Sequence, residues 1–438
     1  RTRAGKEISP TLSLLLLSVF QVLACLQLML HCEQIGRIAA SFGILLVMEW
    51  ALFLLLRLMR RSGFGVETVA LFLTTLGVCV VASSDPDALK KEMIALGAGI
   101  AVFLILGWFL RDLERAKKLR YLAAAAGIAL LVFNLLFGVE KYGAKNWVEL
   151  GPISFQPSEL VKLCFIFAGA STLQRLMTRR NLFLYIVYSA AICGCLALIN
   201  DFGTAIIFFV TFLVIAYLRS GDAATLALIC GGAAFGAGII VQFKPYILSR
   251  FAAWGHAWEA ASGSGYQQTR TMSAAASGGL FGMGAGNGWL ERIPAGDTDL
   301  VFGMLCEEWG LVIALLAVAC ILTLAWFAVR ASRTGRSSFY TIAACAAGSL
   351  LVFQTSLNVF GSVDLLPLTG VTFPFVSNGG SAMLSAWGLL AYLKAMDTRA
   401  DASFAIGRTA ERKLDEEAAR MAAPAEDAFE KEDGHAED

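Results

Sequence analysis

Residues 11–31 read TLSLLLLSVFQVLACLQLMLH, a run without a single Asp, Glu, Lys or Arg. A stretch of about 20 apolar residues is long enough to cross the hydrocarbon core of a bilayer as an α-helix. This run is longer than the apolar region of a secretory signal peptide, and no small-residue cleavage site follows it. We therefore expect it to be a membrane-spanning helix.

Comparable runs recur along the whole chain, which has 438 residues, of which 57% are hydrophobic and 16% charged. A soluble chain would carry nearer a quarter of charged residues. The runs do not alternate in polarity, which favours helices over the strands of a membrane barrel. We predict an all-α polytopic membrane protein with about twelve transmembrane helices. The expected spans are residues 11–31, 38–59, 65–83, 93–110, 119–138, 157–174, 183–200, 203–218, 222–243, 301–329, 338–360 and 376–396.

The distribution of basic residues among the loops predicts how the expected spans are oriented in the membrane. Loops on the N-terminal side of the membrane carry more than twice as many Lys and Arg as the opposite loops, although the opposite set includes the long loop 244–300. Basic residues favour the cytoplasmic side, so both termini are expected to be cytoplasmic. Residues 398–438 are rich in acidic residues and are expected to form a disordered cytoplasmic tail. A net charge of +1 gives no reason to expect nucleic acid as a partner.

The first polar cluster follows the outer loop 139–155 and reads Gln156-Pro-Ser-Glu159. Proline suits the first turn of a helix, and an acidic side chain there complements the helix dipole. Lys162 follows one turn later, so that it shares a helix face with Glu159 and can pair with it. A Lys within a span is costly. It is therefore either a functional residue or half of a buried structural ion pair, and the sequence leaves both readings open.

The second cluster is the long outer loop, which contains the glycine-rich segment 277–288. No strand precedes the glycines and no Lys-Ser/Thr follows them, so a nucleotide site is not indicated. A tightly turned re-entrant segment is the better prediction. The loop ends at Asp297, Thr298 and Asp299, immediately before an apolar span, where each of the three could either cap a helix or act on a substrate. Glu307 and Glu308 lie further in, and at least one should face protein or water.

The third cluster, residues 364–381, contains two prolines and three glycines and cannot form a simple lipid-facing helix. Irregular backbone at membrane depth is tolerated where it lines a cavity or is buried in protein. All three clusters map to the outer face, together with Asp201 at a helix end. Acidic and basic residues collected there suit an anionic, polar substrate presented at the outer membrane surface. The residues are Glu159, Asp201, Glu291, Asp299 and Asp364, and Lys141, Lys145, Lys162, Lys244, Arg250 and Arg270.

At these clusters the chain resembles the SEDS family (shape, elongation, division and sporulation), the FtsW/RodA/SpoVE group. The resemblance runs in order from about residue 65 to 397. It implies a ten-helix core at residues 63–397, preceded by two extra helices within residues 1–62. It rests on Gly143 to Gly151, Phe155-Gln-Pro-Ser-Glu159 with Lys162, Asp201-Phe-Gly-Thr204, Tyr266-Gln267, Ser277 to Gly282, Pro294 to Asp299, Glu307-Glu-Trp-Gly310, Leu366 to Gly370 and Pro374 to Ser381.

The resemblance implies a peptidoglycan glycosyltransferase of the bacterial cell membrane that serves cell elongation, division or sporulation. Such an enzyme polymerises lipid II into glycan strands at the outer face and releases undecaprenyl diphosphate. Asp299 matches the family's proposed catalytic acid/base. Expected substrate contacts are Lys145, Trp147, Gln156, Ser158, Glu159, Lys162, Arg250, Tyr266, Gln267, Glu291, Thr298, Ser377 and Ser381. A divalent cation, Mg²⁺ or Mn²⁺, could bridge Asp299 and the diphosphate, and no organic cofactor is expected.

By analogy the partners are a class B penicillin-binding transpeptidase and other divisome or elongasome membrane proteins. The chain departs from the family pattern at four positions: it has Asn146 for Arg, Ala295 for Glu, Asp297 for His and Asn378 for Tyr. These departures concern substrate preference and rate more than reaction class.

Two other functions fit the residues. One is a lipid II flippase or other transporter, because broken helices and intramembrane charges suit such a protein. The other is a non-catalytic division scaffold, because the altered motifs would suit such a protein.

Overall fold

The computed structural model describes residues 9–59, 63–141, 143–151, 153–172, 179–221, 223–243, 245–333 and 337–397. The predicted acidic tail, residues 398–438, lies outside these ranges. A long helix lies at each of the predicted spans. These helices are α1 (Pro10–His31), α2 (Ile35–Leu58), α3 (Gly65–Ser84), α4 (Leu89–Leu110), α5 (Leu113–Phe137), α6 (Pro157–Thr172), α7 (Arg179–Leu198), α8 (Phe202–Ser220), α9 (Ala223–Phe243), α12 (Val301–Ser332), α13 (Ser338–Ser362) and α14 (Gly380–Ala395).

The predicted helical membrane fold is confirmed. Among the described residues, eight helices are long and apolar enough to cross a membrane: α1 to α5, α8, α12 and α13. The helices α6 and α14 have only 16 residues each, fewer than the about 20 that span a bilayer without help from irregular flanking backbone. The total of twelve spans therefore stays a prediction.

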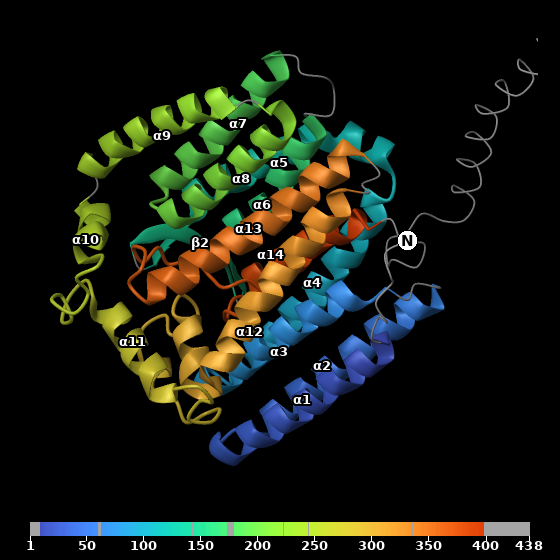
Figure 1. The fold of residues 1–438 in the computed structure, drawn as a ribbon, viewed down its shortest axis with the longest axis vertical. Coiled ribbons are helices and arrows are strands. Elements are labelled where there is room, and N and C mark those ends of the chain that lie inside the picture. Colours follow the sequence, from blue (N-terminus) through green and yellow to red (C-terminus); the bar gives the residue numbers. More distant parts are fainter. Residues whose placement is uncertain are drawn as a thin grey trace, which may run out of the picture.

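The helices form one bundle in which α13 occupies a central position (Figure 1). It packs against α6, α8, α12 and α14, while α1 and α2 lie along one side of the bundle beside α3. Pro157 opens α6, as its fixed φ and missing N–H predict. All three predicted polar clusters lie next to ends of these central helices.

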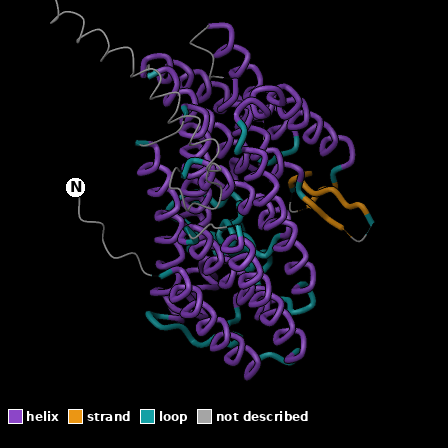
Figure 2. Tube along the Cα trace, turned by 90° about the vertical axis from the view of Figure 1, so that its right-hand side faces the viewer, coloured by secondary structure: helices purple, strands orange, loops and turns teal. Residues whose placement is uncertain are grey.

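The loop 139–155 contains the only strands in the described part of the chain, a small exception to the all-α prediction (Figure 2). Its strands β1 (Val139–Lys141), β2 (Ala144–Leu150) and β3 (Ile153–Phe155) pair antiparallel in that order. The sheet is fixed to the bundle where the backbone N–H of Lys145 donates to the carbonyl of Ile199, 2.9 Å away. This contact places the sheet beside the end of α7 and the start of α8.

The long loop before α12, predicted to be an outer loop, contains two short helices, α10 (Pro245–Ala253) and α11 (Tyr266–Gly278), and the one-turn 3-10 helix η1 (Leu290–Arg292). As expected, the glycine-rich segment is tightly turned. It lies directly on the start of α12, where a Cβ atom on Gly278 would come within 2.0 Å of a backbone oxygen. The helix α12 is itself broken at Gly310, whose φ of 84° only glycine adopts readily. Entry of this segment into the membrane stays a prediction.

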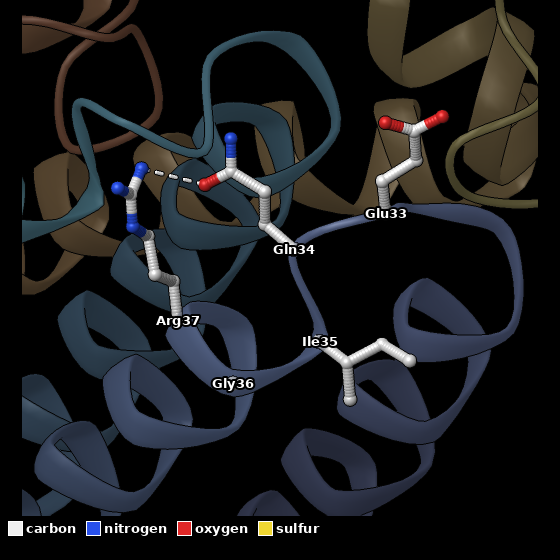
Figure 3. A pocket seen from close by; sticks show the side chains of 5 residues that line it. All are labelled: Glu33, Gln34, Ile35, Gly36 and Arg37. Atoms are coloured by element: carbon white, nitrogen blue, oxygen red, sulfur yellow. Dashed lines mark hydrogen bonds between the residues drawn. The ribbon is translucent and has the colours of Figure 1, made fainter.

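The N-terminal hairpin α1–α2 is attached to α3 by a buried polar network. The Glu49 carboxylate accepts hydrogen bonds from Ser18 (2.9 Å) and from the Gln21 amide (2.7 Å). The same amide donates to Thr75 of α3, 3.0 Å away. The turn between α1 and α2 lines a pocket in which Arg37 donates to Gln34, 2.6 Å away (Figure 3). The extra helices are therefore joined to the core by specific contacts within the membrane.

We predict that Glu49→Leu loosens this hairpin, because Ser18 and Gln21 would each lose one buried hydrogen bond between α1 and α2. The expected loss in the free energy of unfolding is about 1 kcal/mol, typical of hydrogen bonds between membrane helices. Thermal unfolding of the purified protein in detergent measures it. The matched control is Val47→Ala, because Val47 is on the same helix as Glu49 but is 69% exposed. Equal stability of both variants and the parent would contradict the prediction.

Candidate active site

Asp299 lies at the centre of a polar cluster formed by the end of the long outer loop, α10 and the irregular segment between α13 and α14. It immediately precedes α12, whose N-cap is Leu300, with no side-chain cap. None of Asp297, Thr298 and Asp299 therefore serves as the N-cap of this helix. The Asp299 carboxylate comes close to Gly370, where an added Cβ would lie 3.1 Å from Oδ2 and 4.0 Å from a guanidinium nitrogen of Arg250.

The backbone around Asp299 is anchored by side chains from the C-terminal third of the chain. The Asn358 amide donates to the Asp299 carbonyl at 3.0 Å and to that of Val371 at 2.8 Å. The Ser377 hydroxyl donates to the carbonyl of Thr298 at 2.6 Å. Both Asn358 and Ser377 are buried. The carboxylate is thus presented from a backbone whose own acceptors are satisfied.

Burial raises the pKa of Asp299 to about 6. The nearby Arg250 guanidinium opposes this rise, while the carboxylates of Asp201 and Asp297 add to it. Arg250 is itself oriented by the carbonyl of Leu368, to which it donates. A carboxyl group with this pKa is mostly ionised at pH 7 and still holds a proton more readily than an ordinary Asp, which is the property required of a general base.

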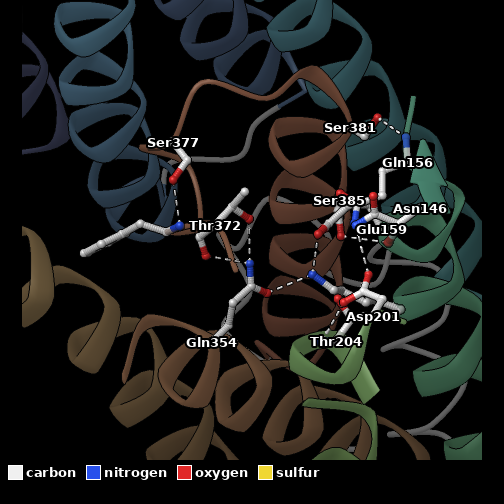
Figure 4. Close-up of polar contacts among 12 residues, drawn as sticks. Asn146, Gln156, Glu159, Asp201, Thr204, Gln354, Thr372, Ser377, Ser381 and Ser385 are labelled. Atoms are coloured by element: carbon white, nitrogen blue, oxygen red, sulfur yellow. Dashed lines mark hydrogen bonds and ion pairs between the residues drawn. The ribbon is translucent and has the colours of Figure 1, made fainter. Parts of the chain in front are cut away.

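A second group of polar residues surrounds Asp201 (Figure 4). Asp201 is the N-cap of α8, and its carboxylate accepts from the backbone N–H of Thr204 at 3.1 Å. Its other oxygen is near the amides of Asn146 (3.3 Å) and Gln156 (3.4 Å). The backbone N–H of Gln156 donates to Ser381 at the start of α14. The two groups are connected through the electrostatic effect of Asp201 on Asp299.

Lys162 is buried beneath these groups and has two partners. Its ammonium donates to Glu159 at 2.7 Å and to Gln354 of α13 at 2.9 Å. Gln354 in turn donates to Thr372, and Ser385 donates to the carbonyl of Glu159 (Figure 4). Of the two readings that the sequence left open, the geometry favours a buried structural ion pair within α6, and the bond from Lys162 to Gln354 links it to α13.

The other predicted contacts are more widely distributed. Lys145 donates to the carbonyl of Leu135, and Gln267 to that of Pro294. Tyr266 lies under the Arg270 guanidinium, 5.3 Å from its ring centroid. The remaining three are Trp147, which is half-buried, Ser158, which is fully buried, and Glu291, which is exposed beside Arg292. Glu307 and Glu308 are both buried, as expected for at least one of them.

Two residues that bind the polar groups were missed in the sequence. Gln354 and Asn358 lie one helical turn apart on α13 and reach the segment 371–372 from the same side. The sequence did contain a signal for these two residues, because two amide side chains four residues apart in an otherwise apolar span are costly unless they face protein. Their position would have indicated that the third cluster lies against the second.

A divalent cation at Asp299 is supported only in part by these residues. Within the described ranges, no group of three or more His, Cys, Asp or Glu side chains is placed to hold a metal ion. Mg²⁺, however, commonly binds through one or two carboxylates together with substrate phosphates. Asp299 fits that arrangement as a single ligand, with most of the coordination supplied by the substrate and water.

The sequence is similar to those of proteins described as peptidoglycan glycosyltransferases. RodA of Mycobacterium tuberculosis, described as a peptidoglycan glycosyltransferase, is 30% identical over 328 residues, which is 69% of each chain. FtsW of Escherichia coli O157:H7, described as a probable peptidoglycan glycosyltransferase, is 33% identical over 302 residues, covering 65% of this chain and 72% of that one.

Solved structures show the same fold. One, described as a peptidoglycan synthase complex that coordinates polymerization and crosslinking, matches with a TM-score of 0.65 and 25% identity over 75% of this chain and 96% of that one. RodA of Thermus thermophilus matches with a TM-score of 0.56 and 24% identity, over 75% and 94% of the two chains. The family model of the FtsW/RodA/SpoVE cell cycle proteins matches residues 68–401. This chain therefore belongs to the FtsW/RodA/SpoVE family of cell cycle proteins.

Proposed function

We propose that this protein is a peptidoglycan glycosyltransferase that polymerises lipid II at the outer face of the cytoplasmic membrane. The observation that carries the proposal is a half-buried carboxylate, that of Asp299, close to the guanidinium of Arg250 where both approach Gly370. A base and a neighbouring cation are the two groups that transfer of a sugar from a lipid diphosphate requires. Family membership and the names of the relatives support the same activity.

In the proposed reaction the 4-hydroxyl of the acceptor sugar attacks the anomeric carbon of the growing chain. Asp299 accepts the proton of that hydroxyl as the new glycosidic bond forms. The bond to the lipid diphosphate breaks at the same carbon, and the diphosphate leaves with the bonding electrons. With a pKa of about 6, Asp299 is available in its basic form at neutral pH.

Arg250 would balance the negative charge on the departing diphosphate. Its guanidinium is aligned by the Leu368 carbonyl and remains partly exposed, so that it can also donate to phosphate oxygens. Charge-assisted bonds of this kind are stronger than those between neutral groups. A bound Mg²⁺ or Mn²⁺ would supply further counter-charge to the same diphosphate. Lys162, by contrast, would act through Glu159 and Gln354 as a structural group.

The excess of basic residues in alternate loops supports an outer location for Asp299 and a cytoplasmic location for both termini. We further propose a class B penicillin-binding transpeptidase as partner. The support is the match to a peptidoglycan synthase complex that combines polymerization with crosslinking. A partner with crosslinking activity would act on the strands that this chain produces.

We predict that Asp299→Ala abolishes polymerisation, because it removes the carboxylate that the proposed reaction assigns as the base. The initial rate should fall at least about a hundredfold, the usual contribution of general base catalysis. The assay is formation of glycan polymer from lipid II by the purified protein in vesicles, without an ion gradient. Glu259→Ala serves as control, because Glu259 is an exposed acid in the same outer loop. Lipid II movement without polymer in the parent protein would indicate a flippase instead.

We predict that Arg250→Gln slows the same reaction by roughly a hundredfold, a typical cost of removing one group that stabilises transition-state charge. Arg250→Lys should retain part of the activity, because the charge remains while the bond to Leu368 is altered. The measurement is the initial rate at saturating lipid II. Arg292→Gln is the matched control, since the Arg292 side chain is exposed. Full activity of Arg250→Gln would remove this residue from the mechanism.

A further inference from the structure

We propose that Asp297 and Asn378 act together as positioning residues that hold the turn bearing Asp299 in its active geometry. This role rests on the proposed function and adds to it two residues outside the reacting pair. Asp297 is in the outer loop and Asn378 is in the irregular segment before α14. The structure brings them into double contact although they lie 81 positions apart in the chain.

Both contacts run from Asn378 to Asp297. The backbone N–H of Asn378 donates to the Asp297 carbonyl at 2.9 Å, and its side-chain amide donates to the Asp297 carboxylate at 2.7 Å. A paired contact fixes direction as well as distance, and a bond to a carboxylate is stronger than one between neutral groups. The contact therefore constrains both the backbone and the side chain of the residue two positions before Asp299.

The turn requires such support because its own geometry is unfavourable. Ala295 has a φ of 61°, the left-handed region that a residue with a side chain avoids. The backbone N–H groups of Thr298, Asp299 and Leu300 all point to the single carbonyl of Ala295, at 3.0 to 3.3 Å. Three donors that share one acceptor bind it less well than three separate pairs. External contacts must therefore contribute to keeping the turn in this form.

The external contacts fall on three consecutive residues. Asn378 donates to Asp297, and the Ser377 hydroxyl donates to the carbonyl of Thr298. The Asn358 amide donates to the carbonyl of Asp299. Only the first of these engages a side chain of the turn. That carboxylate also accepts from Ser84 of α3 at 3.3 Å. Asp297 thus connects the turn to two separate parts of the bundle.

The two side chains also suit each other chemically. A carboxylate and a primary amide are suitable partners, because one only accepts at neutral pH and the other supplies two donors.

Two measurements on the full chain in lipid vesicles test this role: steady-state polymerisation of lipid II, and amide hydrogen exchange of residues 294–300. Asn378→Ala and Asp297→Ala should each lower kcat roughly tenfold, the scale of a lost charge-assisted hydrogen bond, with KM changed less than about twofold, since neither residue is placed to bind substrate. The double variant should be no slower than either single variant. Exchange of residues 297–300 should accelerate in all three.

Two further variants separate positioning from general damage. Asp297→Asn should restore most of kcat and of the exchange protection, because its amide oxygen can still accept from Asn378. Asn287→Ala should resemble the parent, because the exposed Asn287 amide reaches only the Met283 carbonyl in its own turn. Unchanged exchange in Asn378→Ala would overturn the contact, and faster exchange with unchanged kcat would overturn its positioning role. A parent protein that makes no polymer would contradict the proposed function. Hydrogen exchange alone would then show whether the contact between Asn378 and Asp297 stabilises the turn.

Discussion

A polar group within a bilayer has no water to bind, and the structure depends on how this constraint is met. The two Lys residues buried in the described helices each have a carboxylate partner: Lys162 pairs with Glu159, and Lys394 with Glu67 at 3.2 Å. The Lys394–Glu67 pair joins α14 to α3. Lys162 and Glu159 both lie on α6, and the bond from Lys162 to Gln354 joins this helix to α13. Replacing both members by apolar residues of similar size could leave stability unchanged, but losing one member would strand a buried charge. These buried contacts therefore fix which helices lie side by side in the bundle.

The same constraint explains why the irregular segment 364–379 can lie among helices. Its free backbone groups are taken up by side chains of α13, with Gln354 donating to Thr372 and Asn358 to Val371. An irregular segment held in this way can bring Gly370 close to a carboxylate, which a continuous helix could not do. The candidate active site thus depends on an irregular segment between two helices, and buried amide side chains stabilise that segment by binding its backbone carbonyls.

The helices and the polar clusters could be predicted from the sequence because their signals are local. Apolar length defines a span, and Pro157 or Asp201 marks a helix start without reference to the rest of the chain. The pairing of Glu159 with Lys162 was also accessible, since both lie on one helix face. The small sheet at residues 139–155 was missed because its strands are only 3 to 7 residues long and pack against the bundle through backbone contacts.

Contacts between distant clusters could not be predicted in this way. In the sequence, Asp297 and Asn378 are two separate departures from the family pattern, and only the fold shows that they are in contact. Asn146 is a similar case, because its amide reaches Asp201 from a strand that the sequence did not reveal. In this chain both amides donate to a carboxylate of the candidate site. Contacts of this kind would serve a scaffold as well as an enzyme, and it is the relatives described as peptidoglycan glycosyltransferases that favour an enzyme over a non-catalytic scaffold.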